Sequence, residues 1–379
     1  MWGEPLERSA ITIFLCGDIM TGRGIDQILP SPCDPHIHEP YVRNARRYVD
    51  LVENVNGPIP MPAGFSHVWG DALEILEWMA PDARIINLET SITTSDDYWR
   101  GKGINYRMHP ANIPCLIAAA IDVCSIANNH VIDWGFPGLA ETLLTLKAVG
   151  LKTAGAGNNL CEATAPAVVE VTGRGRVLVF SFGCESSGIP EKWAATSDSP
   201  GVWLLPDLGH KTLRAVHARI LEEKRPGDVV VASIHWGGNW GYGVARDEAA
   251  FARNLIDHAA VDVVHGHSSH HPKGIEVFHG KAIIYGCGDF INDYEGINGY
   301  EQFRGELGLM YFLRIDPLSG KLLDLRMKPT RMKNFRVNRT SRTEAQWLAD
   351  MLNREGEPYG TRVDLGGDDT LVLHWRGNT

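Results

Sequence analysis

The chain has 379 residues, of which 44% are hydrophobic and 22% are charged. These proportions are those of a globular protein and exclude a disordered or fibrous chain. Acidic residues outnumber basic ones by 46 to 36, which gives a formal net charge of −10. Because a surface that binds nucleic acid needs clustered positive charge to displace counterions, we expect no nucleic-acid partner.

The N-terminal residues do not resemble an export signal, because Glu4, Glu7 and Arg8 precede only a short apolar run at 11–15. No apolar stretch of the sequence reaches the roughly 18 residues that a membrane-spanning helix needs. We therefore predict a cytoplasmic protein with no membrane partner. The seven cysteines form an odd set without a CxxC pair and are expected to be reduced, buried thiols. A catalytic thiol at Cys287, between two glycines, stays open as an alternative.

Apolar runs typical of strands alternate with helical periods along the chain, which is the pattern of an α/β layered fold. Strands are expected at 12–15, 84–88, 123–126, 177–182, 229–234, 261–264 and 282–285. Helices are expected between them at 71–79, 137–149, 211–223 and 247–259. After residue 316 we predict a strand pair through Lys328, a helix at 343–352 and a strand at 371–375.

We assign residues 1–330 to one catalytic domain and residues 331–379 to a C-terminal extension packed on the same core. The segment 25–62 is rich in Pro, His, Asn and charged residues, so we predict a surface insertion rather than a core element. The irregular stretch 185–206 contains Trp193 and Trp203. It either lines a substrate cleft or is a surface loop held by two packed tryptophans.

Six predicted strands are followed by polar side chains that can bind a metal or move a proton. These side chains are Asp18, Glu89, the pair Asn129 and His130, His235, His267 and Asp289. In α/β sheets ligands bind beyond the carboxyl ends of the strands, so we expect the six ends to converge on one site. Charged groups at the edge of an apolar sheet are costly to bury unless they are paired or coordinated, and a cation would satisfy them.

The predicted metal ligands are Asp18, Glu89, Asn129, His235 and His267. Imidazole nitrogens suit Mn, Zn or Fe, whereas carboxylate and amide oxygens suit Ca or Mg, so we predict a divalent metal ion and leave its identity open. The sequence has no GxxxxGKS/T loop and no GxGxxG motif after its first strand. Nucleotide-dependent phosphoryl transfer and dinucleotide redox chemistry are therefore disfavoured.

The run 265–272 holds four histidines, some of which can bind a metal while others act as acids or bases. Histidine titrates near a pH of about 6.5, and a neighbouring carboxylate fixes its tautomer. The candidate catalytic groups are the imidazoles of His130, His235, His267 and His270 and the carboxylates of Asp18, Asp133 and Asp289. Asp293 is a further candidate carboxylate partner.

Several short motifs, in their order along the chain, resemble the CapA family of poly-γ-glutamate capsule synthesis proteins. The matching pieces are Gly17-Asp18-Ile19-Met20, Asn87-Leu88-Glu89-Thr90, Ala127-Asn128-Asn129-His130 with Asp133-Trp134-Gly135, Gly155-Ala156-Gly157, His235-Trp236-Gly237, Gly266-His267 with His270, and Tyr285-Gly286-Cys287-Gly288-Asp289-Phe290. The resemblance covers about residues 12–290. It implies a calcineurin-like, metallophosphatase-type α/β sandwich. It also implies a metal near Asp18, Glu89, Asn129, His130, His235 and His267.

The chain departs from the family pattern at several positions. Met20 stands where phosphoesterases of this fold usually have a histidine, and Asp289 replaces a common asparagine. Gly238 stands where a glutamate is frequent, and the segment 266–272 differs from the usual Gly-His-His-Pro-His. Capsule members are typically anchored or exported, whereas a cytosolic branch, the lasso-peptide epimerases, looks similar to this chain in these respects.

We therefore hypothesise a metal-dependent peptide epimerase that inverts a Cα centre of a ribosomal precursor peptide by proton transfer between His and Asp groups. The precursor peptide is then the expected partner. The alternatives are a poly-γ-glutamate or capsule biosynthesis protein, a metallophosphoesterase, and a binding protein with a structural metal. The sequence makes no prediction of the oligomeric state.

Overall fold

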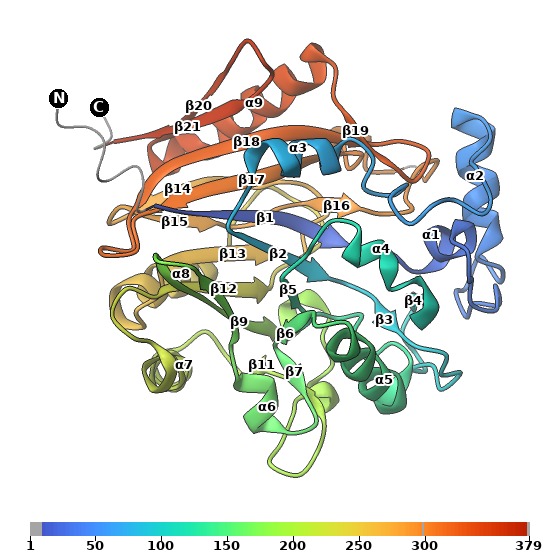
Figure 1. Cartoon of the computed structure of the whole chain (residues 1–379), viewed down its shortest axis with the longest axis horizontal. Coiled ribbons are helices and arrows are strands. Elements are labelled where there is room, and N and C mark those ends of the chain that lie inside the picture. The colour runs from blue at the N-terminus through green and yellow to red at the C-terminus, as the bar shows by residue number, and fades with distance from the viewer. Residues whose placement is uncertain (1–9, 298, 377–379) are drawn as a thin grey trace.

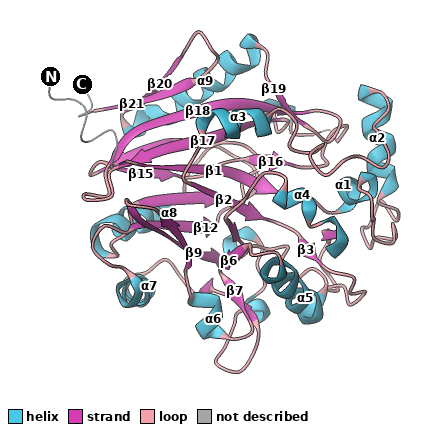
Figure 2. Cartoon of the chain, in the orientation of Figure 1, coloured by secondary structure: helices cyan, strands magenta, loops and turns pink. Residues whose placement is uncertain are grey.

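The structure is a computed structural model that describes residues 10–297 and 299–376. Two large β-sheets face each other, and most helices lie on their outer sides (Figure 1, Figure 2). The first sheet contains, in order, β20 (Thr361–Leu365), β21 (Leu371–Trp375), β18 (Leu322–Met332), β17 (Leu307–Ile315), β1 (Ile11–Ile19), β2 (Ala83–Leu88), β5 (Val123–Ser125) and β6 (Lys152–Ala154), with β16 (Asp289–Ile291) beside β1 and β19 (Val337–Arg339) beside β18.

The second sheet is smaller and lies against the first. It contains, in order, β11 (Leu204–Leu205), β9 (Gly175–Cys184), β12 (Val229–His235), β13 (Val263–His267), β15 (Lys281–Ile284) and β14 (Ile275–Phe278), with β8 (Ala167–Val171) beside β9. Two short pairs stand apart from both sheets, β3 (Ser91–Ile92) with β4 (Arg107–Met108) and β7 (Ala156–Gly157) with β10 (Gly201–Val202).

The helices fall into groups by the surface that they cover. The α-helices are α1 (Arg23–Ile28), α2 (Arg46–Asn56), α3 (Ala72–Met79), α4 (Pro114–Ile117), α5 (Gly135–Ala148), α6 (Leu160–Thr164), α7 (His210–Glu223), α8 (Arg246–His258) and α9 (Arg342–Gly356). Helices α1 to α5 contribute to the apolar cluster on the outer side of the first sheet, and α7 and α8 to that of the second. A third cluster fills the space between the sheets. The predicted α/β sandwich is confirmed.

Strand β1 shows how the sequence produces these layers. Its residues Ile11, Ile13 and Leu15 belong to the apolar cluster between the sheets, whereas Phe14 and Cys16 belong to the apolar cluster on the outer side of the first sheet. Successive side chains of a strand point to opposite faces, so a strand covered on both faces is apolar at every position. This is why continuous apolar runs marked the central strands in the sequence.

The segment 25–62 is not the surface insertion that the sequence predicted. It includes most of α1 and all of α2. The side chains of Ile25, Ile28, Val49 and Val52 lie in the apolar cluster on the outer side of the first sheet. Helix α2 buries Tyr48, Val49 and Val52 and exposes most of its other residues, so its overall composition is polar although one face belongs to the core. Average composition therefore hid the buried stripe.

The sequence predicted that Asp289 lies at the end of the strand 282–285, but the structure differs. Strand β15 ends at Ile284, and Asp289 begins the separate strand β16, which pairs in parallel with β1 and places Asp289 opposite Asp18. Gly288, just before β16, has a positive φ of 78° that glycine adopts without strain. The turn through Gly288 redirects the chain from the second sheet to the first.

Residues 331–376 extend the first sheet and contribute to the core between the sheets. Strand β21 pairs with β18 and β20. Helix α9 begins with a capping box in which Ser341 and Glu344 satisfy each other's backbone N–H groups, and it buries Leu348 and Leu352. The C-terminal region and the preceding chain thus share one apolar cluster.

The structure also bears on the predictions for the two tryptophans, the cysteines and membrane-spanning helices. Trp193 and Trp203 are both buried, so the stretch 185–206 is held by packed tryptophans. All seven cysteines are free thiols, and six are buried, whereas Cys161 is exposed, contrary to the prediction. Cys287 is fully buried and burial raises its pKa well above its ordinary value, which removes the support for a catalytic thiol. Among the described residues, no helix combines the length and apolarity needed to cross a bilayer.

Candidate metal centre

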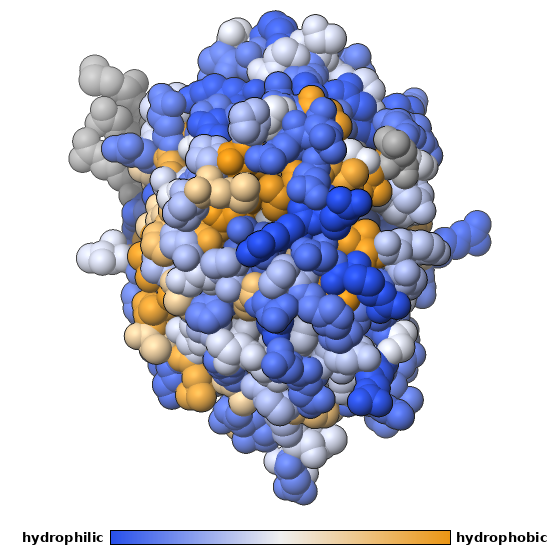
Figure 3. All heavy atoms as spheres, turned by 90° about the vertical axis from the view of Figure 1, so that its right-hand side faces the viewer, coloured by the Kyte–Doolittle hydropathy of each residue, from blue (hydrophilic) through white to orange (hydrophobic). Residues whose placement is uncertain are grey.

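The register of the parallel strands brings the predicted residues together. Asp18 near the end of β1 pairs with Asn87 of β2, and His235 at the end of β12 pairs with His267 at the end of β13. Strands β1 and β2 point toward the right-hand side of Figure 1, and Figure 3 shows that side, whose surface is largely hydrophilic with smaller hydrophobic patches. The strand ends of both sheets thus supply polar groups to one edge of the sandwich.

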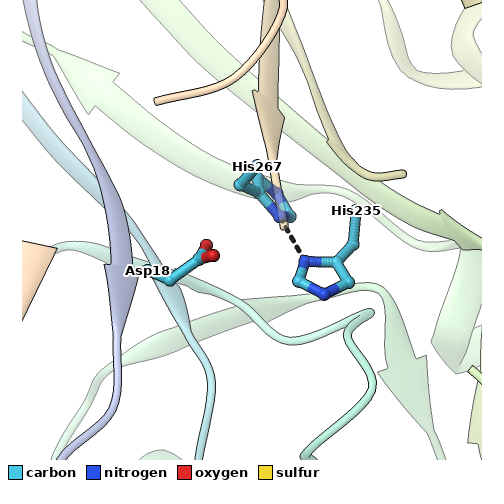
Figure 4. A group of neighbouring side chains, drawn as sticks. All are labelled: Asp18, His235 and His267. Carbon is cyan, nitrogen blue, oxygen red and sulfur yellow. Dashed lines mark hydrogen bonds between the residues drawn. The ribbon is translucent and has the colours of Figure 1, made fainter. Parts of the chain in front are cut away.

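At the centre, the carboxylate of Asp18 faces the rings of His235 and His267 (Figure 4). The potential ligand atoms of these three residues all lie within 4.8 Å of one another, and all three side chains are buried. The Nδ1 atoms of His235 and His267 are 2.7 Å apart. The other ring nitrogen of His267 lies 2.9 Å from Ser233 Oγ, which fixes the ring so that Nδ1 faces the centre.

Two more predicted ligands border this group. Glu89 Oε1 lies 3.9 Å from His235 Nε2, and Asn129 Oδ1 lies 3.1 Å from the same nitrogen. Asn87, for which no role was predicted, donates hydrogen bonds from its Nδ2 to Asp18 Oδ1 at 2.8 Å and to Glu89 Oε2 at 3.1 Å. The structure therefore gathers all five predicted metal ligands in one place.

The electrostatics of these residues favour a bound cation. Burial raises the pKa of Asp18 to about 7, with a further contribution from the charge of Asp289, and burial together with Asp18 raises the pKa of Glu89 well above its ordinary value. Burial also lowers the pKa values of His235 and His267 well below the usual range, so both rings are neutral nitrogen donors. Buried carboxylates that repel one another beside neutral imidazoles fit a divalent metal, which removes the repulsion.

His130 forms the first of two histidine–carboxylate pairs beside the centre. Its Nδ1 lies 2.6 Å from Asp133 Oδ2, and its Nε2 lies 3.8 Å from Glu89 Oε1. The carboxylate of Asp133 also accepts hydrogen bonds from Lys102 Nζ and from the Tyr106 backbone N–H. Burial lowers the pKa of His130 to about 4, so the ring is neutral and its Nε2 can accept a proton.

His270 forms the second pair, which also lies close to Asp18. Its Nδ1 lies 2.9 Å from Asp289 Oδ1, and Asn292 donates a hydrogen bond to the second oxygen of Asp289 at 3.0 Å. The potential ligand atoms of Asp18, His270 and Asp289 also lie within 4.8 Å of one another. Burial alone would lower the pKa of His270, but the charge of Asp289 and its hydrogen bond raise it, so this ring can give a proton near neutral pH.

Other predicted partners and histidines have structural contacts outside the centre. Asp293 forms a buried ion pair with Arg23 rather than with a histidine. His265 donates from Nε2 to the Cys16 carbonyl at 2.8 Å, and His271 Nε2 accepts the Gly241 backbone N–H at 3.0 Å. Thus His267 and His270 of the run 265–272 reach the centre, and its other two histidines do not.

Sequence reasoning missed Lys102, Tyr106 and Tyr294, which also lie beside the two histidine–carboxylate pairs. Lys102 lies in the irregular stretch before β4, Tyr106 directly precedes β4, and Tyr294 follows β16. None of them ends an apolar run, which was the signal that revealed the other residues. Only their contacts in three dimensions identify them.

Comparisons with known proteins place the chain in a family. The profile described as bacterial capsule synthesis protein (PGA_cap) matches residues 12–294. A probable polyglutamine synthesis accessory protein of Mycobacterium tuberculosis is 47% identical over 374 residues, which are 98% of this chain and 97% of that protein. The PGA biosynthesis protein CapA of Bacillus subtilis is 28% identical over 229 residues, which are 60% of this chain and 57% of that protein.

Among solved structures, a phosphatase of Mycoplasma pneumoniae covers 84% of this chain and 93% of its own, with a TM-score of 0.45 and 12% identity, a likeness too distant to bear on function. The family profile, by contrast, spans the strand ends that carry every residue of the centre, from Asp18 to Asp289. Together with the relative that matches almost the whole chain, it confirms the resemblance read from the short motifs. The chain belongs to the bacterial capsule synthesis protein family, the family of CapA.

Proposed function

We propose that this protein is a metal-dependent enzyme of bacterial polymer synthesis that acts on the amide-linked chain of a glutamate or glutamine polymer. One observation carries the proposal: Asp18, His235 and His267 offer ligand atoms within 4.8 Å of one another, Glu89 and Asn129 border them, and two histidine–carboxylate pairs lie beside them. So many buried ionisable groups in one place are costly for a purely structural role. The names of the relatives from Mycobacterium tuberculosis and Bacillus subtilis supply the class of polymer.

The residues of the chain divide the chemistry between them. Asp18, Glu89, Asn129, His235 and His267 would hold the divalent cation, which when bound polarises a substrate oxygen as a Lewis acid. Breaking or forming an amide bond requires one group to take a proton from the attacking atom and another to give a proton to the leaving atom. His130 Nε2 is suited to the first role and His270, held by Asp289, to the second.

The proposal is tested with purified protein loaded with Mn²⁺ or Zn²⁺ and with oligomers of γ-linked glutamate or glutamine as substrates. Mass spectrometry should reveal a metal-dependent change in chain length that Asp18→Asn abolishes. Asp228→Asn is the matched control, because Asp228 is also buried but pairs with Arg176 just before the start of β12, at the end away from His235. Absence of any metal-dependent change with both oligomers would overturn the proposal, and turnover of 4-nitrophenyl phosphate instead would favour a phosphoesterase.

The peptide epimerase hypothesis is a second candidate. It is favoured by the presence of two separate histidine–carboxylate pairs beside the centre, His130 with Asp133 and His270 with Asp289, since inversion at Cα needs one acid or base for each face. The names of the relatives support polymer synthesis better. Incubation with a ribosomal precursor peptide in deuterated water distinguishes the two, because an epimerase incorporates one deuterium at Cα without changing chain length.

A further inference from the structure

Two tyrosines connect the two histidine–carboxylate pairs. The ring of Tyr106 packs edge-on against His130, with centroids 4.6 Å apart, and the ring of Tyr294 packs edge-on against His270 at 5.2 Å. The hydroxyl of Tyr106 donates a hydrogen bond to the hydroxyl of Tyr294 at 3.0 Å. The two phenols therefore form a continuous wall from one pair to the other.

The wall is rigid because a buried guanidinium lies behind it. The Cζ atom of Arg23 is 4.9 Å from the centroid of the Tyr106 ring and 5.7 Å from that of Tyr294. Arg23 is itself held by ion pairs with Asp293 and Glu39. Cation–π contacts from a fixed guanidinium keep both rings in place without using their hydroxyl groups.

The hydroxyl of Tyr294 has only a poor acceptor. It donates to the sulfur of Met20 at 3.3 Å, and a thioether sulfur is a weak acceptor. The Tyr294 oxygen already accepts a hydrogen bond from Tyr106, so the Tyr294 hydroxyl proton is available to donate to a stronger acceptor than the Met20 sulfur. Tyr294 is partly exposed, whereas Asp18 and Tyr106 are fully buried, so part of the Tyr294 side of the centre is open to solvent.

The hydroxyl stays protonated beside the carboxylates of the centre. Burial raises the pKa of Tyr294 well above its ordinary value, and the charges of Asp289 and Glu89 raise it further. A phenol in these surroundings donates a hydrogen bond at neutral pH and does not act as a base.

We propose that Tyr294 is a catalytic residue whose hydroxyl turns from Met20 to donate a hydrogen bond to a substrate oxygen that gains negative charge, with Tyr106 as its positioning residue. This inference rests on the proposed function for the nature of that oxygen, the carbonyl of the amide link. A fixed donor aimed at a developing oxyanion is typically worth about 100-fold or more in kcat.

The experiment measures binding of an oxyanion separately from turnover. Inorganic phosphate is titrated calorimetrically into Mn²⁺-loaded wild-type protein and into Tyr294→Phe, which keeps the ring and removes only the hydroxyl. We expect the affinity for phosphate to fall about 10-fold or more, as for loss of one hydrogen bond to a charged acceptor. Tyr285→Phe is the matched control, because it also removes one buried hydroxyl, which is bonded to Glu276 away from the centre, and it should keep the wild-type affinity.

The second readout is turnover of the γ-linked oligomers. Tyr294→Phe should lower kcat about 100-fold with little change in KM. Equal phosphate affinity of Tyr294→Phe and wild type, or no binding of phosphate to the wild type, overturns the role of Tyr294 whatever the turnover result. Loss of phosphate affinity in Tyr294→Phe without turnover of any oligomer by the wild type supports the role of Tyr294 and overturns the proposed polymer substrate.

Discussion

The direction of each histidine ring separates ligands from structural residues in the run 265–272. His267 Nδ1 faces His235 across 2.7 Å, whereas the neighbouring His271 accepts a backbone N–H from Gly241 and packs against Phe303. Both residues are fully buried, so burial does not distinguish them. What distinguishes them is whether a ring nitrogen points toward carboxylates whose charge a cation would neutralise.

This difference gives a prediction for single residues. His267→Gln should weaken Mn²⁺ or Zn²⁺ binding by more than about 100-fold, because loss of partners outside the ligand shell alone typically costs 10- to 100-fold. His271→Gln should bind the metal as the wild type does. Isothermal titration of both variants provides the measurement, and similar affinities in the two would contradict the assignment of His267 as a ligand.

Among the elements, the contact of β1 with β16 shows why part of the site could not be predicted. A Cβ atom at Gly17 would lie 1.7 Å from the Gly288 carbonyl oxygen, so this approach of the two strands requires glycine at residue 17. The approach sets Asp18 opposite Asp289. Both glycines belong to the motifs identified in the sequence. The pairing of two strands about 270 residues apart could not be predicted, because the residues around each glycine do not specify the partner strand.

The packing of α3 against β19 supplies a prediction on pH. Asp71, just before α3, accepts hydrogen bonds from the Arg336 side chain at 2.6 Å and from the Arg339 backbone N–H at 2.9 Å. Burial alone would raise the pKa of Asp71, but these bonds outweigh it and lower the pKa. A carboxylate with a lowered folded pKa stabilises the fold above its unfolded pKa of about 3.9, and this contribution is lost as pH falls below that value.

Asp71→Asn should therefore lower the free energy of unfolding by about 1 kcal/mol at pH 7 and by progressively less as pH falls below about 4. Urea denaturation at a series of pH values measures the difference. Glu74→Gln is the control from the same contact, because the ion pair between Glu74 and Arg339 is exposed and should contribute less than about 0.5 kcal/mol. A difference for Asp71→Asn that is independent of pH would exclude the ion pair as its cause.

For the whole molecule, sequence periodicity predicted the central layers well and the periphery poorly. Strands β1, β2, β12 and β13 are apolar on both faces and end in the residues that the sequence singled out. Segment 25–62 was predicted wrongly because its buried stripe is mixed with exposed polar residues. Lys102 and Tyr294 were missed because their places depend on loops, whose paths are set by tertiary contacts and not by a local period.

The two sheets are tied together at the centre, so metal binding should stabilise the molecule as a whole. Asp18 and Glu89 come from the first sheet, and His235 and His267 come from the second. A ligand that binds only the folded state stabilises it by about 2.7 kcal/mol when its free concentration is 100 times its Kd. For a chain of 379 residues, this corresponds to an increase in Tm of about 3 °C.

Differential scanning calorimetry with saturating Mn²⁺ or Zn²⁺, and again after addition of a chelator, measures this increase. The wild type should lose it on chelation, since the buried carboxylates of Asp18 and Glu89 then again repel each other. His267→Gln should show the lower Tm with or without metal, whereas His271→Gln should respond as the wild type does. If chelation left the Tm of the wild type unchanged, the two sheets would be held at their edge by contacts within the chain alone, and the carboxylates would have to share protons instead of a cation.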